Sequence, residues 1–165
     1  MVKEVKQTKQ TISTQQLEAA YDAYGTAVYR LAMAFLGHYS DAEDVTQETF
    51  YRLLYRAPTF TDENHQKRWL LQVAANLCRN QLRVFWRKLV TQLEDTVPAI
   101  VPEELEALNT VMALPEQYKL PIHLYYYEGY SVAETAEILK LGQSAVKMRL
   151  KRGRELLKIE LEGSN

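Results

Sequence analysis

The sequence has one cysteine, three histidines and no long hydrophobic run. A single cysteine, Cys78, excludes an internal disulfide and a cysteine-based metal site, and it is consistent with a reducing cytoplasm. The histidines, His38, His65 and His123, lack the spacing of metal ligands. No run approaches the roughly 20 apolar residues that cross a bilayer, and residues 1–16 lack the apolar centre of a signal peptide. We therefore expect a cytoplasmic protein with no metal, no cofactor and no membrane insertion.

Motifs typical of enzymes are also missing. The sequence has no glycine-rich phosphate loop, no dinucleotide-binding motif and no nucleophile elbow. One acidic segment, Asp41 to Glu48, could suggest a nuclease, but no histidine accompanies it and no convergent set of carboxylates is apparent. We expect a protein that is not an enzyme.

The composition is that of a globular protein, and the spacing of its apolar residues indicates helices. The chain has 165 residues, 47% of them hydrophobic, and 20 basic residues nearly balance 21 acidic ones. This length suits one domain or two small ones, and two small domains would each be marginally stable alone. Apolar residues recur at spacings of three and four along most of the chain, which predicts an all-α fold.

The first half predicts three helices after a disordered tail over residues 1–14. Apolar residues from Leu17 to Phe35 form one helical stripe. Ser40 and Glu43 have the spacing of a capping box, which predicts a second helix over about residues 41–55 that ends before Pro58. Its exposed face carries Asp44, Gln47 and Glu48 at i, i+3 and i+4. That face is either a binding surface or a solvated acidic helix start.

A third helix is predicted from a cap at Asp62 or Asn64 to about Lys88. Residues 65–88 hold six basic residues and no acid. Asn76 and Asn80 share one helix face beside Arg79 and Arg83, and such amides and arginines are used to recognise bases. The aromatic residues among these bases, Trp69 and Phe85, could stack on unpaired nucleotides, although core packing is the simpler interpretation.

Residues 90–103 differ in character, with Pro98 and Pro102 among them, and are interpreted as a flexible linker. It divides the chain into two small helical domains, residues 15–89 and 104–162. In the second domain the tyrosine-rich segment before Gly129 predicts a packed helix, with His123 as a surface or hydrogen-bonded histidine.

Residues 131–158 have the pattern of a helix-turn-helix. Ser131 and Glu134 form a second capping-box pair, Gly142 suits a tight turn with positive φ, and Ser144 is a candidate N-cap for the last helix. From Gln143 to Lys158 six basic residues face a single acid, Glu155. Concentrated positive charge on a turn-flanked helix favours DNA binding over a merely solvated basic face.

Three segments in this order resemble the extracytoplasmic-function (ECF) sigma factors of bacterial RNA polymerase. They are DAEDVTQETFYRLL, then Phe60 followed after eight residues by WLLQVAANLCRNQLR, and then LPEQYKLPIHLYYYEGYSVAETAEILKLGQSAVKMRLKRGRELL. The resemblance covers about residues 17–160. It implies that the first domain is sigma domain 2 and the second is sigma domain 4.

The resemblance also implies partners and site residues. The acidic helix would dock on the β′ clamp helices of core RNA polymerase, and the family also contacts the β subunit. The third helix and its preceding loop would capture the melted strand of the −10 promoter element, and the last helix would read the −35 element in the major groove. An anti-sigma factor is a further expected partner and could hold the protein at the membrane. The residues implied for polymerase docking are Asp41, Asp44, Gln47 and Glu48; for the −10 element, Phe60, Asn76, Asn80 and Arg83; and for the −35 element, Lys147, Met148, Arg149, Lys151, Arg152 and Arg154.

Some residues depart from the family pattern. Arg149 and Arg154 are better suited to phosphate or structural contacts than to base edges. Gly153 stands where the family usually has alanine and is expected to loosen the last helix by roughly 1 kcal/mol. The competing class is a self-sufficient helix-turn-helix regulator, which would usually be a dimer, but no coiled-coil heptads are apparent.

Overall fold

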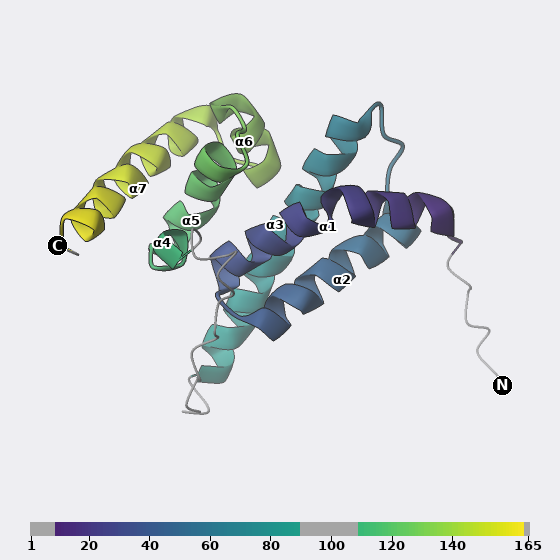
Figure 1. Cartoon of the computed structure of the whole chain (residues 1–165), viewed down its shortest axis with the longest axis horizontal. Helices are drawn as coiled ribbons and strands as arrows, with labels where there is room; N and C mark the ends of the chain where they lie inside the picture. The colour runs from purple at the N-terminus through teal and green to yellow at the C-terminus, as the bar shows by residue number, and fades with distance from the viewer. Residues whose placement is uncertain (1–8, 90–108, 164–165) are drawn as a thin grey trace.

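A computed structural model describes residues 9–89 and 109–163, and these ranges hold helices and no strand. Figure 1 shows α1–α3 as one bundle with α4–α7 packed beside it. This arrangement confirms the predicted all-α fold with two helical domains. The predicted linker lies outside the described residues, so the domain boundaries stay predictions. The elements are α1 (Thr14–Leu36), α2 (Tyr39–Arg56), α3 (Glu63–Leu89), α4 (Asn109–Met112), α5 (Glu116–Ile122), the π-helical turn η2 (His123–Tyr127), α6 (Val132–Leu139) and α7 (Gln143–Gly163).

Helix α1 begins with a capping box and ends at a glycine. The Ser13 hydroxyl accepts from the Gln16 amide while the Gln16 side chain accepts from the Ser13 amide. Gly37 ends the helix with φ 66°, a conformation that glycine adopts without steric cost. The predicted disordered tail does not extend to residue 14, because the Thr11 amide donates to the Leu54 carbonyl at 2.7 Å. Residues 11–13 therefore fasten the start of α1 to the end of α2.

The capping box predicted at Ser40 is wrong. Helix α2 begins at Tyr39, two residues before the predicted start, and His38 precedes it in an extended conformation without a side-chain cap. The chain turns sharply at Gly37, so it re-enters helix before Ser40 is reached. The predicted end is confirmed, since Ala57 is extended ahead of Pro58. The inner face of α2 consists of Ala42, Val45, Phe50 and Leu53, which are buried.

Helix α3 is buried on two of its sides. The Asp62 carboxylate accepts from the His65 amide at 2.7 Å, which confirms Asp62 rather than Asn64 as the cap. On one side, Leu70 and Ala74 are buried. On the other side of the helix, Leu71, Ala75 and Cys78 are fully buried. Arg68 and Arg79 flank these three residues and contact α6. The side chain of Phe85 lies outside the described part of α3.

The turn of the helix-turn-helix differs from the prediction. The capping box at Ser131 and Glu134 is confirmed. The left-handed residue, however, is Lys140 with φ 53°, and Gly142 does not have positive φ. Helix α7 begins at Gln143, so Ser144 lies inside its first turn and the predicted N-cap is wrong. The left-handed residue of the turn thus lies two positions before the predicted Gly142.

Gly153 is a packing residue of α7. A Cβ built on it would lie 2.7 Å from Ile122 Cγ1 and 2.8 Å from Ile122 Cδ1, closer than side chains tolerate. The missing side chain lets α7 approach α5 directly. The loss of helix propensity expected at Gly153 stays a prediction, and it is accompanied here by a close contact that only glycine permits.

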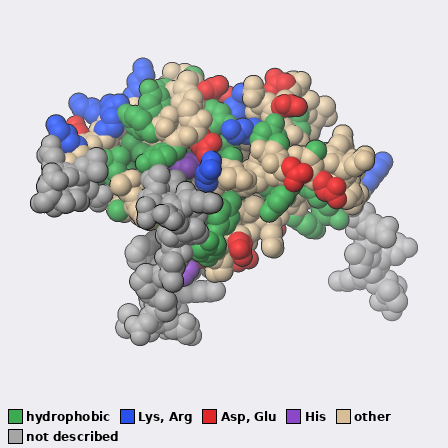
Figure 2. All heavy atoms as spheres, in the orientation of Figure 1, with side chains coloured by type: hydrophobic (Ala, Val, Ile, Leu, Met, Phe, Trp, Pro, Cys, Tyr) green, Lys and Arg blue, Asp and Glu red, His purple; other side chains and the backbone are tan. Residues whose placement is uncertain are grey.

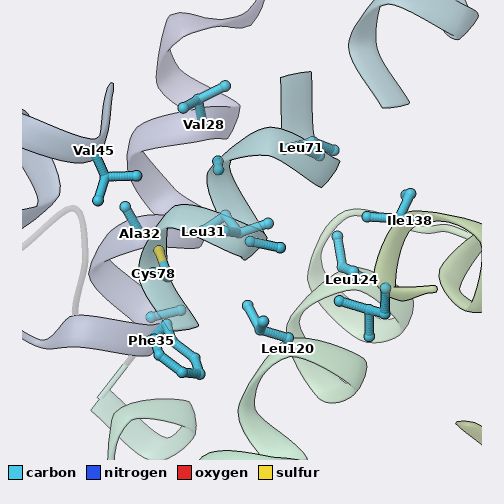
Figure 3. Packing of buried hydrophobic residues seen from close by; sticks show 14 of the residues in the cluster. Val28, Leu31, Ala32, Phe35, Val45, Leu71, Cys78, Leu120, Leu124 and Ile138 are labelled. Atoms are coloured by element: carbon cyan, nitrogen blue, oxygen red, sulfur yellow. The ribbon is translucent and has the colours of Figure 1, made fainter. Parts of the chain in front are cut away.

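The two bundles share one hydrophobic core. Helix α1 contacts α4, α5 and η2, and α3 contacts α6. Figure 3 shows Phe35 and Leu71 of the first bundle facing Leu120, Leu124 and Ile138 of the second. The sequence analysis described two tethered domains and did not anticipate this contact. It is physically reasonable, since each small bundle alone buries a low fraction of its apolar surface.

Polar contacts also join the bundles. Lys119 Nζ donates to the Phe35 carbonyl at 3.1 Å, and Arg79 Nη1 donates to the Leu139 carbonyl at 3.3 Å. Lys67 Nζ lies 3.9 Å from Glu128 Oε2. His123 is 1% exposed, with Nε2 3.5 Å from Glu128 Oε1, so the surface alternative for this histidine is wrong.

Candidate nucleic-acid interface

Helix α7 carries a basic exposed face above an apolar buried one. Val146 and Leu150 are buried against α5 and α6, which turns the opposite side of the helix to solvent. Met148 lies on that side and is 72% exposed, so it is not a core residue. The basic residues exposed with it are Lys147, Lys151, Arg152, Arg154 and Lys158. This face has the charge and the accessibility needed to enter a DNA groove.

The arginines of α7 have different surroundings. Arg152 Nη1 donates to Glu155 at 3.2 Å across one exposed turn, a contact that is readily exchanged. Arg154 Nη1 donates to the Tyr126 hydroxyl at 2.9 Å, and this hydrogen bond raises the pKa of Arg154. Arg149 is half-buried and faces a pocket between the two bundles. Arg149 and Arg154 thus have the structural surroundings that the sequence analysis considered for them.

Helix α3 presents a second candidate face. Asn80 and Arg83 are exposed and Asn76 is half-buried, and their spacing of four and three brings them to one side of the helix. Phe60, in the loop before α3, packs its ring edge against Trp69 with the centroids 5.6 Å apart. The loop therefore lies against the first turns of α3, on the helix that carries the two asparagines.

The predicted docking residues lie on α2 but do not share one environment. Asp44 and Gln47 are exposed. Glu48 is half-buried and pairs with Arg52 Nε at 3.0 Å, and Asp41 accepts from Gln81 Nε2 of α3 at 2.9 Å. Asp41 thus supports the packing of α2 on α3, while Asp44 and Gln47 are free to meet a partner.

Charge is distributed unevenly over the molecule. Figure 2 shows Lys and Arg side chains gathered at the end of the molecule where α7 lies, and Asp and Glu side chains along the half formed by α1–α3. A net charge of −1 for the whole chain hides this separation. Two surfaces of opposite sign suit partners of opposite sign.

Arg79 is the residue whose role the sequence analysis missed. It was associated with Asn76 and Asn80, but its guanidinium turns the other way, to the Leu139 carbonyl of α6. Its position four residues after Ala75 and eight after Leu71 could have indicated this, because both of those residues are buried. The pattern alone did not say that this side of α3 has a neighbour.

Two further observations bear on the function class. No helix among the described residues is long and apolar enough to cross a membrane. Within the same ranges, no group of three or more histidine, cysteine, aspartate or glutamate residues could hold a metal ion.

Comparison with known proteins gives matches along most of the chain. The family model for Sigma-70 region 2 matches residues 20–88, and that for Sigma-70 region 4 matches residues 104–157. The ECF RNA polymerase sigma factor SigW of Bacillus subtilis (strain 168) is 31% identical over 160 residues, covering 85% of this chain and 86% of SigW. SigM of the same organism is 30% identical over 153 residues, covering 86% of this chain and 93% of SigM.

Solved structures show the same fold. The sigma factor RpoE of Bartonella quintana, solved in complex with the anti-sigma factor NepR, superposes with a TM-score of 0.76, covering 90% of this chain and 98% of RpoE at 22% identity. CnrH, solved with the cytosolic domain of CnrY, superposes with a TM-score of 0.66, covering 93% of this chain and 92% of CnrH at 22% identity. Both sigma regions are thus present in order, and the protein belongs to the ECF family of RNA polymerase sigma factors, which direct RNA polymerase to promoters.

Proposed function

We propose that the protein engages polymerase and promoter through three separate surfaces. Asp44 and Gln47 of α2, with Glu48 at the edge of that face, dock on the β′ clamp helices of core RNA polymerase. The face of α3 that holds Asn76 and Asn80 binds the melted −10 strand, and α7 reads the −35 duplex. The observation that carries this proposal is the separation of an acidic exposed face on α2 from a basic exposed face on α7.

The residues within each surface have different roles, which follow from their local contacts. On α7, Lys147, Lys151 and Arg152 are exposed and reach for base edges, with Met148 offering apolar contact. Arg154, held by Tyr126, and Arg149, half-buried, contact the DNA backbone instead. In domain 2, Arg83 follows Asn80 on the same face of α3, and Phe60 packs on Trp69 ahead of Asn76; both assist capture of unstacked bases.

Recognition depends on polymerase because each surface alone is small. A single basic helix on a chain of net charge −1 binds DNA weakly. Core polymerase, contacted through its β′ and β subunits, holds the two domains at the promoter spacing, so that two weak sites act together through effective concentration. Capture of unpaired bases by domain 2 favours the open promoter because those bases are accessible only there.

An initiation assay tests the function. Purified core polymerase is incubated with the protein and with promoter fragments from the source genome, and run-off transcripts are measured. We expect new transcripts only when both proteins are present. Failure to change initiation on every promoter tried would count against the proposal.

A second assay separates a sigma factor from a self-sufficient regulator. Gel shifts on the same fragments are performed without polymerase, together with size-exclusion chromatography. A sigma factor binds weakly and runs as a monomer, whereas a regulator shifts DNA alone, usually as a dimer.

An anti-sigma factor is a further proposed partner. The support is that RpoE and CnrH, which share this fold, were each solved in a complex, RpoE with the anti-sigma factor NepR and CnrH with the cytosolic domain of CnrY. Such a partner would act on this protein in the cytoplasm or hold it at the membrane. Affinity purification from the native cell, followed by mass spectrometry, would identify it.

A further inference from the structure

The pocket between the two bundles is lined by two arginines from opposite domains. It lies where α1, α3, α5 and α7 meet and has a volume of about 440 Å³. Arg79 enters it from α3 and Arg149 from α7, with Phe35 and Leu120 as apolar walls. Glu116 is the one acidic residue in this lining, and it is exposed.

Among the described residues neither guanidinium forms an ion pair, and the charge of Glu116 in the same lining acts on Arg79. Arg79 uses one donor for the Leu139 carbonyl, which leaves most of its five N–H groups available. Among the described residues Arg149 forms no hydrogen bond and no ion pair. Both side chains are half-buried, so water screens their mutual repulsion less than it would at the surface.

The surroundings of the pocket lower the tendency of Arg79 and Lys119 to stay protonated. Burial, and then the charge of Arg149, lowers the pKa of Arg79, and the charge of Glu116 offsets part of this effect. Burial likewise lowers the pKa of Lys119, which stands on α5 beside the pocket and binds the Phe35 carbonyl. Two cations, Arg79 and Arg149, thus line one cavity. An anion entering it would relieve their repulsion and would form charge-assisted hydrogen bonds with both arginines.

We propose that this interdomain pocket is a phosphate-binding site, in which Arg79 and Arg149 bind one phosphate group from opposite sides. The planar fork of a guanidinium matches the geometry of phosphate oxygens, and the volume admits a phosphate or a pyrophosphate. Because the two ligands come from different domains, an occupied site favours the packed arrangement of the bundles. The phosphate is either a free one or one in a nucleic-acid backbone. The inference does not depend on the promoter contacts proposed above.

The test uses the full chain and four variants. Arg79→Gln and Arg149→Gln each remove one guanidinium, and the double variant removes both. Arg56→Gln is the matched control, because Arg56 is exposed at the end of α2, away from the pocket. Circular dichroism and thermal unfolding show whether each variant is folded.

Binding is measured with two probes at constant ionic strength. Pyrophosphate represents a free phosphate, and a duplex oligonucleotide without terminal phosphates represents the backbone. We expect each single Gln variant to raise the Kd of one probe by roughly tenfold or more, as loss of one charge-assisted hydrogen bond implies, while Arg56→Gln leaves it unchanged. The probe that shows this effect identifies the source of the phosphate.

The Arg79→Gln variant distinguishes phosphate binding in the pocket from DNA binding by α7. One possible result is that Arg149→Gln weakens duplex binding while Arg79→Gln binds as well as the control variant does. That result would reflect only the recognition helix and would overturn the proposal. It is also overturned if neither probe distinguishes the pocket variants from Arg56→Gln. Loss of transcription with intact pyrophosphate binding would affect the proposed promoter contacts and leave this site standing.

Discussion

Gly153 of α7 lies so close to Ile122 of α5 that a Cβ on the glycine would be 2.7 Å from Ile122 Cγ1. The basic helix is therefore held against its own domain by backbone contact at this point. Tyr118 Cβ lies on the same side, 3.5 Å from the position of that Cβ. Since Ile122 is fully buried, any movement that makes room for a methyl group must displace its core neighbours.

We expect Gly153→Ala to lower the free energy of unfolding by about 1–3 kcal/mol, the usual cost of overpacking. The gain in helix propensity, about 1 kcal/mol, opposes this and does not cancel it. Urea denaturation followed by circular dichroism measures the change. An unchanged or increased stability would show that α5 and α7 can separate without cost.

A second substitution provides the control for this prediction. Ile122→Ala removes the two atoms that the new methyl group would meet. We expect Gly153→Ala to be better tolerated in that background than in the natural one, because contacting residues are not additive. Additive effects of the two changes would indicate that Gly153 acts through the backbone alone.

Glu128 should make the free energy of unfolding depend on pH. Burial raises its pKa, but the contact with His123 and the charges of His123, Lys67 and Arg30 outweigh burial, and the pKa falls below its ordinary value of 4.5. A carboxyl with a lowered pKa stabilises the folded protein above the unfolded value, and this contribution is lost as the pH falls through the folded value.

The variant Glu128→Gln removes this contribution. We expect the wild type to be more stable than the variant near neutral pH, and the difference to shrink as the pH falls below about 4.5. Denaturation at a series of pH values measures it. Glu137→Gln is the control, since the Glu137 side chain is 66% exposed and should change the profile little. Parallel profiles for the wild type and Glu128→Gln would contradict the assignment.

Asp44→Arg should abolish copurification with core polymerase. Asp44 is exposed on the outer face of α2, so reversal of its charge leaves the fold intact and opposes the proposed docking. Pull-down with purified core measures binding, and circular dichroism verifies the fold. Glu18→Arg makes the same charge change at an exposed position of α1 and should bind normally. Normal binding by Asp44→Arg would reject the docking face.

Arg152→Ala tests base reading by α7. In the polymerase complex we expect a loss of about 1–3 kcal/mol in binding, together with relaxed preference at one base pair of the −35 element. Affinities for a set of single-base promoter variants measure both effects. Equal weakening on every sequence would instead mark Arg152 as a phosphate contact.

Local patterns were sufficient for most helices and for the exposed basic helix. The stripe from Leu17 to Phe35, the capping box at Ser131 and the stop before Pro58 depend on neighbours within a few residues, and all three are found. Predictions at Ser40, Gly142 and Ser144 failed at helix ends. There the turn at Gly37 and the left-handed Lys140 decided which residue begins the next helix.

The sequence by itself determined an all-α chain, the exposed basic stripe on its last helix and, through its motifs, the sigma family. Tertiary structure alone decided which side of α3 meets α6, why Gly153 has no side chain, and how Arg79 and Arg149 reach one pocket. The physical reason is distance along the chain. Periodicity indicates whether a residue is buried or exposed on its own helix. These features arise between segments about 30 to 70 residues apart, where only packing brings the side chains together.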